Sequence, residues 1–198
     1  MTRAELPVLH ALRCGGYSGT ARLARATGLS EFETESVLID LAATGLVTRE
    51  FGAWGLTNAG RAADAARIAR ELESAGARAE VTAGYERFLV LNPELLDLCT
   101  AWQLRPVDGV PAVNDHDDHA YDARVLDRFA DLHERTGPVL SALEAALPRF
   151  GRYRARLAGA LDRAFGGELE YVADDTAAYH TVWAELHEDL LATLGIPR

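Results

Sequence analysis

Apolar and polar residues in the first part of the chain recur with the spacing of short helices. The pattern predicts one helix over residues 4–13 and a second over 20–27, which Gly28 terminates. A third helix begins after Ser30, because Ser30 and Glu33 form an S-x-x-E capping box. The apolar stripe of this helix is expected to be buried and consists of Val37, Leu38 and Leu41.

The stretch LVTREFGAWGLT, residues 46–57, has a different pattern. Two short segments rich in Val, Thr, Phe and Trp flank a turn that contains glycine, which predicts a β-hairpin. A long helix is expected to follow from about Asn58, with a bend or an interruption near Gly76.

From residue 79 onward the pattern indicates helices alone. The first of them is expected to stop at Asn92-Pro93, where asparagine caps and proline occupies the first position of the next helix. The polar segment 105–119, which contains two prolines, is expected to be a loop. The further expected helices cover residues 93–104, 119–135, 138–147, 152–165 and 175–194.

These elements predict a mainly α fold with two modules. Residues 1–78 would form three helices and a β-hairpin, and residues 79–198 an all-helical domain. Charge separates the modules as well, because residues 1–78 hold nine arginines and nine acidic residues, whereas the whole formal charge of −10 lies in residues 79–198. A nucleic acid partner would therefore have to contact the first module.

Composition indicates a soluble globular protein, with 48% hydrophobic and 25% charged residues. No apolar run approaches the roughly 18 residues of a membrane span, and Glu5 and Pro7 fall where a signal sequence would be apolar. Cys14 and Cys99 lie far apart and form no CxxC pair, so we interpret both as reduced core thiols. We expect a cytoplasmic protein with no membrane partner.

The segments ARLARATGLSEFETESVLIDLAATGLVTR and WGLTNAGR carry a resemblance to a known family. Their order of small-residue helix, tight turn, second helix, hairpin and L-T-x-x-G-R helix start resembles a MarR-like winged helix-turn-helix. The segments FLVLNPELLDLCTAWQLRP, AVNDH and HTVWAELHEDLLATLG resemble the C-terminal half of actinobacterial winged-helix transcriptional regulators. The resemblance implies a winged helix-turn-helix DNA-binding domain followed by a helical domain.

In winged helix proteins the second helix of the motif enters the major groove, and the hairpin reaches the flanking backbone. The resemblance therefore implies that the third helix contacts bases and that three arginines contact phosphates. The implied base contacts are Ser30, Glu31, Thr34 and Glu35, and the implied phosphate contacts are Arg22, Arg25 and Arg49.

The third helix is acidic, which weakens its affinity for DNA. It carries no basic residue between Glu31 and Ala43. Glu33 belongs to the capping box, and Glu31 is stabilised at the positive end of the helix dipole. Because few arginines neutralise phosphates, we expect a shallow salt dependence, and DNA binding by a homodimer that packs through the helix near 58–75.

A small-molecule site is expected in the second module. Trp102 and Arg105 end an apolar helix, the NDHDDHAYD segment follows, and the last helix has two histidines beside an apolar stripe. Aromatic and polar groups on apolar walls are typical of ligand pockets. The alternative is that these groups pair with one another and close a solid core. The candidate ligand-binding residues are Trp102, Arg105, Asn114, His116, His180, Trp183 and His187.

The same polar segment offers weak metal candidates in Asp115, His116 and His119. The alternative is helix capping, because acidic residues gather at helix N-termini. His180 and His187 would lie about 10.5 Å apart along a helix, too far for an easy shared metal. We therefore predict neither a metal nor a cofactor.

Together these features predict a DNA-binding transcriptional regulator that senses a small molecule through its acidic C-terminal module. Two alternatives stay open. One is an enzyme that uses the Asp/His cluster for acid–base chemistry and the winged helix as a scaffold that does not bind DNA. The other is a protein-binding module. The sequence has no nucleotide-binding glycine loop, nucleophile elbow or zinc-ribbon spacing, which disfavours the enzyme.

Overall fold

The computed structural model describes residues 4–107 and 109–197. The chain is 74% helix and 9% strand, which confirms the mainly α class. It forms two compact units: one contains the residues up to Ala79 together with those from Glu185 onward, and the other contains Glu80–Ala184. Among the described residues, no helix combines the length and the apolar character needed to cross a membrane.

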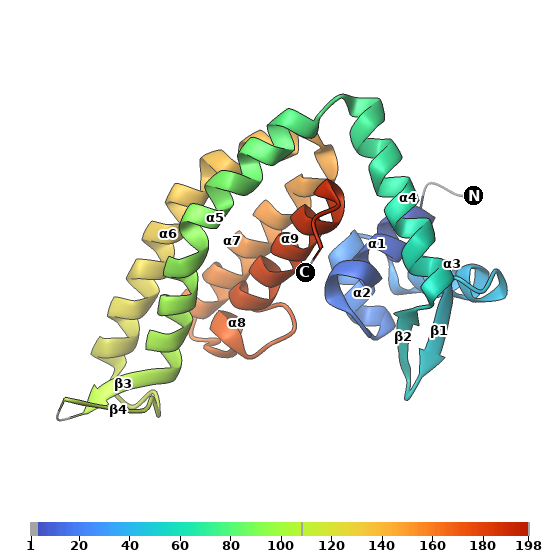
Figure 1. Cartoon of the computed structure of the whole chain (residues 1–198). Coiled ribbons are helices and arrows are strands. Elements are labelled where there is room, and N and C mark those ends of the chain that lie inside the picture. The colour runs from blue at the N-terminus through green and yellow to red at the C-terminus, as the bar shows by residue number, and fades with distance from the viewer. Residues whose placement is uncertain (1–3, 108, 198) are drawn as a thin grey trace. The chain divides into compact units, whose positions relative to one another are not determined.

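The first unit consists of helices and a two-stranded sheet (Figure 1). Strands β1 and β2 are antiparallel and pair Val47 with Leu56, and a single β-bridge joins Ser18, which lies between the first two helices, to Trp54. The elements are α1 (Glu5–Gly15), α2 (Thr20–Thr27), α3 (Glu31–Ala43), β1 (Val47–Glu50), β2 (Ala53–Leu56) and α4 (Asn58–Ala75).

Local signals fix the ends of these helices as the sequence predicted. Gly28 ends α2 in the left-handed conformation, at φ 76°. The Ser30 hydroxyl accepts a hydrogen bond from the Glu33 amide at 3.2 Å, and the Glu33 carboxylate accepts one from the Ser30 amide at 3.0 Å. Thr57 caps α4 by accepting from the Gly60 amide at 3.0 Å. The buried core of the unit includes Leu9, Leu23, Val37, Leu38, Leu41 and Trp54.

The second unit is built on long helices and a second hairpin, β3–β4. In Figure 1, α5 and α6 run side by side, and the Leu143 side chain of α6 packs directly against Gly84 of α5. The elements are α5 (Arg78–Gln103), β3 (Leu104–Val107), β4 (Val110–Val113), α6 (His119–Ala146), η1 (Pro148–Phe150), α7 (Gly151–Phe165), α8 (Glu170–Ala173) and the part of α9 (Tyr179–Leu194) that precedes Glu185.

Two helix breaks that the sequence predicted are absent from the described residues. Pro93 lies inside α5, and Pro138 lies inside α6. An internal proline costs a helix about 3 kcal/mol. Burial on both sides of Pro93 offsets this cost, because Phe88 and Leu95 are both fully buried. Tertiary packing therefore overrides the local signal.

The expectation of an all-helical second module is also wrong, because part of the predicted loop 105–119 forms the β3–β4 hairpin. The strands pair Pro106 with Pro111 directly across the ladder. Proline cannot donate a hydrogen bond, so it is found only at sheet edges. A two-stranded ribbon consists entirely of edges, which is why both prolines fit.

The division into units differs from the predicted boundary at one point. The change near residue 79 matches, but the segment from Glu185 onward groups with the first unit rather than with the second. Carboxylates of this segment pair with the first unit: Glu185 contacts Arg22 at 2.7 Å, and Glu188 contacts Arg13. Helical periodicity alone cannot predict which unit such a segment joins.

Candidate functional site

The predicted DNA-contacting residues of α3 differ in their exposure. Ser30 and Glu31 are exposed, whereas Thr34 is fully buried. The Thr34 hydroxyl donates to the Ser30 carbonyl at 2.9 Å. A side chain in the core cannot contact a base, so the prediction of Thr34 as a base contact is wrong.

Glu35 links three elements of the first unit. Its carboxylate accepts a hydrogen bond from the Thr20 hydroxyl of α2 at 2.6 Å and lies 3.7 Å from the Arg49 guanidinium of β1. Arg49 also lies over the ring of Trp54, with 5.2 Å between the guanidinium carbon and the ring centroid. Glu35 and Arg49 thus partly neutralise each other.

The other two predicted phosphate contacts lie on α2. The Arg22 guanidinium is 2.7 Å from Glu185 and only about a quarter exposed, at 23%. Arg25 is exposed on the same helix. Arg25 and Arg49 are therefore better placed than Arg22 to meet a polyanion.

The exposed face of α3 combines acidic and apolar side chains. Phe32 is 85% exposed and Ile39 is 55% exposed, and Phe51 at the tip of the β1–β2 turn is fully exposed with a left-handed φ of 50°. Apolar groups of this kind favour contacts with other apolar groups, whether a thymine methyl or a protein side chain.

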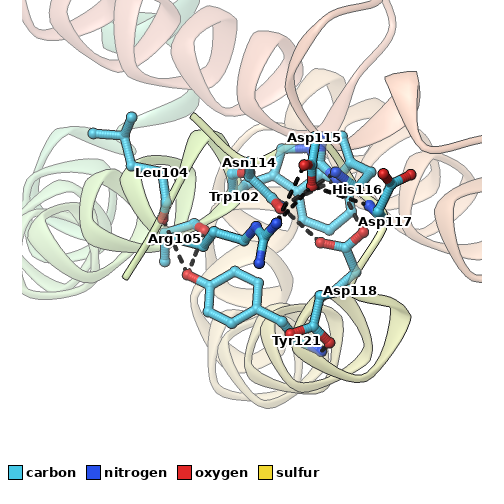
Figure 2. Close-up of polar contacts among 11 residues, drawn as sticks. Trp102, Leu104, Arg105, Asn114, Asp115, His116, Asp117, Asp118 and Tyr121 are labelled. Atoms are coloured by element: carbon cyan, nitrogen blue, oxygen red, sulfur yellow. Dashed lines mark hydrogen bonds and ion pairs between the residues drawn. The ribbon is translucent and has the colours of Figure 1, made fainter. Parts of the chain in front are cut away.

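In the second unit, the β3–β4 hairpin and the start of α6 gather four of the predicted ligand-binding residues. Figure 2 shows Trp102, Arg105, Asn114 and His116 converging beside Tyr121. The hairpin folds back on the end of α5, because the Asn114 amide donates to the Gln103 carbonyl at 2.8 Å. The structure therefore brings together residues that the sequence places up to fourteen positions apart.

Asn114 is the buried centre of this cluster, at 5% exposure. Its side-chain amide donates to the Trp102 carbonyl at 3.0 Å and to the Asp122 carboxylate at 2.7 Å. Its side-chain oxygen accepts from the His116 amide at 3.3 Å. Both ends of the Asn114 amide are therefore used to hold the hairpin onto α5 and α6.

His116 is an oriented imidazole. Its Nδ1 lies 3.0 Å from the Asp122 carboxylate, and its ring packs on the Trp102 indole with centroids 4.6 Å apart. Its backbone is left-handed, at φ 62°, which is uncommon for a residue other than glycine and is found at functional sites. In the tautomer whose Nδ1 donates to Asp122, Nε2 is a hydrogen-bond acceptor.

A groove of about 340 Å³ lies beside the cluster, between the end of α5, the hairpin and the start of α6. Its apolar walls include Leu104, Pro106 and Pro111, and its polar groups include Arg105 and Tyr121. Arg105 pairs with Asp115 at 3.0 Å. A hydrogen bond from the Asp117 backbone amide, and then the Arg105 guanidinium, lower the pKa of the exposed Asp115 carboxyl. The buried Nε of Arg105 has no hydrogen-bond partner within residues 4–107 and 109–197.

The candidates on α9 lie elsewhere. The Trp183 indole donates to the Asn92 side chain at 2.9 Å and stacks on Phe88 with centroids 4.7 Å apart. Asn92 precedes Trp102 on α5 by ten residues, or about 15 Å of helix. Trp183 is therefore a core residue away from the hairpin. His180 is half-buried near it, and His187 belongs to the first unit.

The weak metal candidates do not form a ligand set. Asp115 pairs with Arg105, His116 pairs with Asp122, and His119 is exposed at the start of α6. Among the described residues, the side chains whose ligand atoms lie close enough to share an ion are His10, Cys14 and Asp189 of the first unit.

Two residues of the hairpin site were absent from the predicted set. They are Tyr121 and Asp122, which both belong to the NDHDDHAYD segment. The Tyr121 hydroxyl lies 2.7 Å from the Ala101 carbonyl and 3.1 Å from the Leu104 carbonyl, at the end of α5. The signal in the sequence is the i, i+3 spacing from Asp118, which caps α6 by accepting from the Tyr121 amide at 2.9 Å.

Comparisons with known proteins found no relative of this chain. No family model matches the chain, and neither curated proteins nor solved structures gave a match. The MarR-like resemblance of the sequence accordingly stays a prediction.

Proposed function

We propose that the protein is a transcriptional regulator that binds double-stranded DNA through its first unit. The observation that carries the proposal is the order of elements, in which α1, a β-bridge at Ser18, α2, α3 and the β1–β2 hairpin follow one another. A winged helix-turn-helix has this order, with the last helix before the hairpin as the recognition helix. The Ser18–Trp54 bridge is the feature that a bare three-helix domain would lack.

Arg25 on α2 and Arg49 on β1 are the proposed phosphate contacts, and Ser30 and Glu31 face the groove. Because α3 offers no basic residue, its exposed Phe32 is the side chain suited to a thymine methyl. Affinity then depends on few phosphate contacts, so binding weakens only gradually with salt.

The test is a salt titration of binding to the DNA upstream of the protein's own gene, followed by fluorescence anisotropy. Replacing Arg25 and Arg49 together by Ala should lower the slope of log K against log salt by about 2 for each bound protomer, since each phosphate contact contributes about 0.9. Arg87→Ala, an exposed arginine of α5, is the matched control and should leave the slope unchanged. Absence of binding by the wild type at low salt would refute the proposal.

We further propose that the regulator acts as a homodimer. The buried face of α4 includes Asp64, Ile68 and Leu72, which leaves its opposite face, rich in exposed alanine, open to a second copy. Light scattering that finds only monomer at micromolar concentration would contradict this part of the proposal.

The groove beside the β3–β4 hairpin is the proposed effector site. Its apolar walls and the Arg105 guanidinium suit a small molecule with an apolar body and a negatively charged group. A thermal-shift screen of aromatic carboxylates tests this chemistry. Compounds that stabilise the wild type should lose their effect with Arg105→Ala and keep it with Arg87→Ala.

A further inference from the structure

A second cluster of reactive side chains lies in the core of the first unit. His10 and Cys14 are one turn apart on α1, and Asp189 reaches them from α9. The His10 Nε2 atom is 3.0 Å from an Asp189 carboxylate oxygen and 3.5 Å from the Cys14 sulfur. The three ligand atoms, one from each residue, all lie within 4.8 Å of one another.

The two separations from His10 Nε2 are close to those around a tetrahedral metal ion. Zinc binds nitrogen and oxygen at about 2.0–2.2 Å and sulfur at about 2.3 Å, so tetrahedral angles put a nitrogen and an oxygen about 3.3 Å apart. The same angles put a nitrogen and a sulfur about 3.6 Å apart. The Cys14 sulfur and the Asp189 oxygen lie within 4.8 Å of each other, so these two side chains would have to close on the ion to reach tetrahedral separations.

The surroundings orient two of the three ligands. The His10 Nδ1 atom lies 3.1 and 3.2 Å from the two carboxylate oxygens of Asp64 on α4, and Nε2 faces Cys14 and Asp189. With an ion bound, Nδ1 would donate to Asp64 and Nε2 would be the ligand. The Thr193 hydroxyl donates to Asp189 at 3.0 Å. A histidine whose second nitrogen donates to a carboxylate is the usual outer-shell arrangement of metal sites.

The charge of the cluster favours a cation. His10, Asp64 and Asp189 are at most 1% exposed, whereas Cys14 is half-buried. Two carboxylates beside one imidazole, removed from water, stabilise positive charge at this position.

We propose that the first unit binds one zinc-like divalent transition metal ion through His10 Nε2, the Cys14 thiolate and the Asp189 carboxylate, with Asp64 orienting His10. A thiolate and an imidazole select such ions over magnesium and calcium. Three protein ligands leave a fourth position for water or an external ligand. The Cys14 side is half-buried, which gives the ion a route in. The site stands whether or not the protein binds DNA.

Cobalt(II) titration of the full-length, reduced, chelator-treated protein tests the proposal. Cobalt should produce tetrahedral d–d bands and a thiolate-to-cobalt charge-transfer band that saturate at one ion per chain, and zinc should abolish them. Cys14→Ser should remove the charge-transfer band, whereas Cys99→Ser, the matched control in the second unit, should leave it intact. Asp64→Asn should keep the bands and lower the affinity about 10- to 100-fold.

A cobalt spectrum without a thiolate band in the folded wild type, or a band that survives Cys14→Ser, would overturn the proposal. Alkylation provides a second measurement. It uses the wild-type protein, so it does not require any variant to fold. Zinc should slow iodoacetamide labelling of Cys14 at least about tenfold, as read by mass spectrometry, and unchanged labelling would also overturn it. Cys99 is the internal reference, because burial raises the pKa of its thiol to about 11 and keeps it unreactive with or without zinc.

Discussion

The imidazole of His10 is held by the carboxylate of Asp64, 54 residues later in the chain, at 3.1 Å and with both side chains at 1% exposure. This pair ties α1 to α4 inside the core of the first unit. A buried hydrogen-bonded ion pair contributes little to stability compared with apolar packing, but removal of one partner is costly. Without Asp64, His10 would lose the carboxylate at Nδ1 and keep Asp189 at Nε2.

Asp64→Ala should therefore destabilise the first unit by about 3 kcal/mol, the usual cost of removing one member of a buried pair. Hydrogen exchange of peptides from α1 and α4, measured with a chelator present, reports this loss. Asp64→Asn keeps a hydrogen-bond partner and should cost less. Asp40→Ala, an exposed acid of α3, is the control and should change stability by less than about 0.5 kcal/mol. Equal effects of the Asp64 and Asp40 variants would contradict the interpretation.

Gly60 should not tolerate a side chain. A Cβ at this position would lie 1.9 Å from the Leu46 carbonyl oxygen, because the first turn of α4 packs against the backbone before β1. Gly60→Ala should destabilise the first unit by about 1–3 kcal/mol through overpacking. Gly159→Ala is the matched control: a Cβ added to this glycine of α7 would meet no atom within 4 Å, so the change should stabilise by about 0.5–1 kcal/mol. Urea denaturation of both variants checks the opposite signs.

The elements that the sequence predicted correctly depend on neighbours within four residues. The Ser30–Glu33 capping box and the glycine stop at Gly28 act locally, so their effect on helix ends could be read from the chain. The continuous helix through Pro93 could not be predicted from the sequence. Its stability comes from tertiary packing, in which Phe88 and Leu95 are fully buried.

The candidate sites show the same limit. Trp102, Asn114 and His116 were predicted to meet, and they do, because a short hairpin joins them. Trp183 was placed with them on composition alone, but the indole is held by Asn92 instead. The predicted helix 4–13 contains His10 but stops short of Cys14, and the sequence does not reveal that Asp189, 179 residues after His10, would complete the group.

Tyr121 should stabilise the hairpin site through its hydroxyl. This group lies within hydrogen-bond distance of the Ala101 and Leu104 carbonyls, where α5 ends and its last carbonyls lack helical partners. Tyr121→Phe should cost about 1 kcal/mol, the net value of one such bond. Faster hydrogen exchange confined to residues 101–122 is the expected measurement. Tyr17→Phe, at a half-exposed tyrosine of the first unit, should leave that segment unchanged.

His133 should make the second unit less stable in acid. Its Nδ1 lies 3.3 Å from the Tyr179 hydroxyl, and the two rings meet edge to face with centroids 5.8 Å apart. Burial lowers the pKa of His133, although the nearby Asp162 carboxylate opposes the shift. The folded state therefore binds this proton less readily than the unfolded state, whose histidine pKa is about 6.5.

The sign of the pH dependence follows from that difference. The stability linked to His133 is complete above about pH 6.5 and falls as the pH drops from there through the lower folded pKa. His133→Gln removes this titration, so the unfolding midpoint of the second unit should fall less on acidification than in the wild type. His119→Gln, at an exposed histidine of the same helix, should behave like the wild type. An NMR titration of the His133 ring that gives a pKa at or above the ordinary value would contradict the prediction directly.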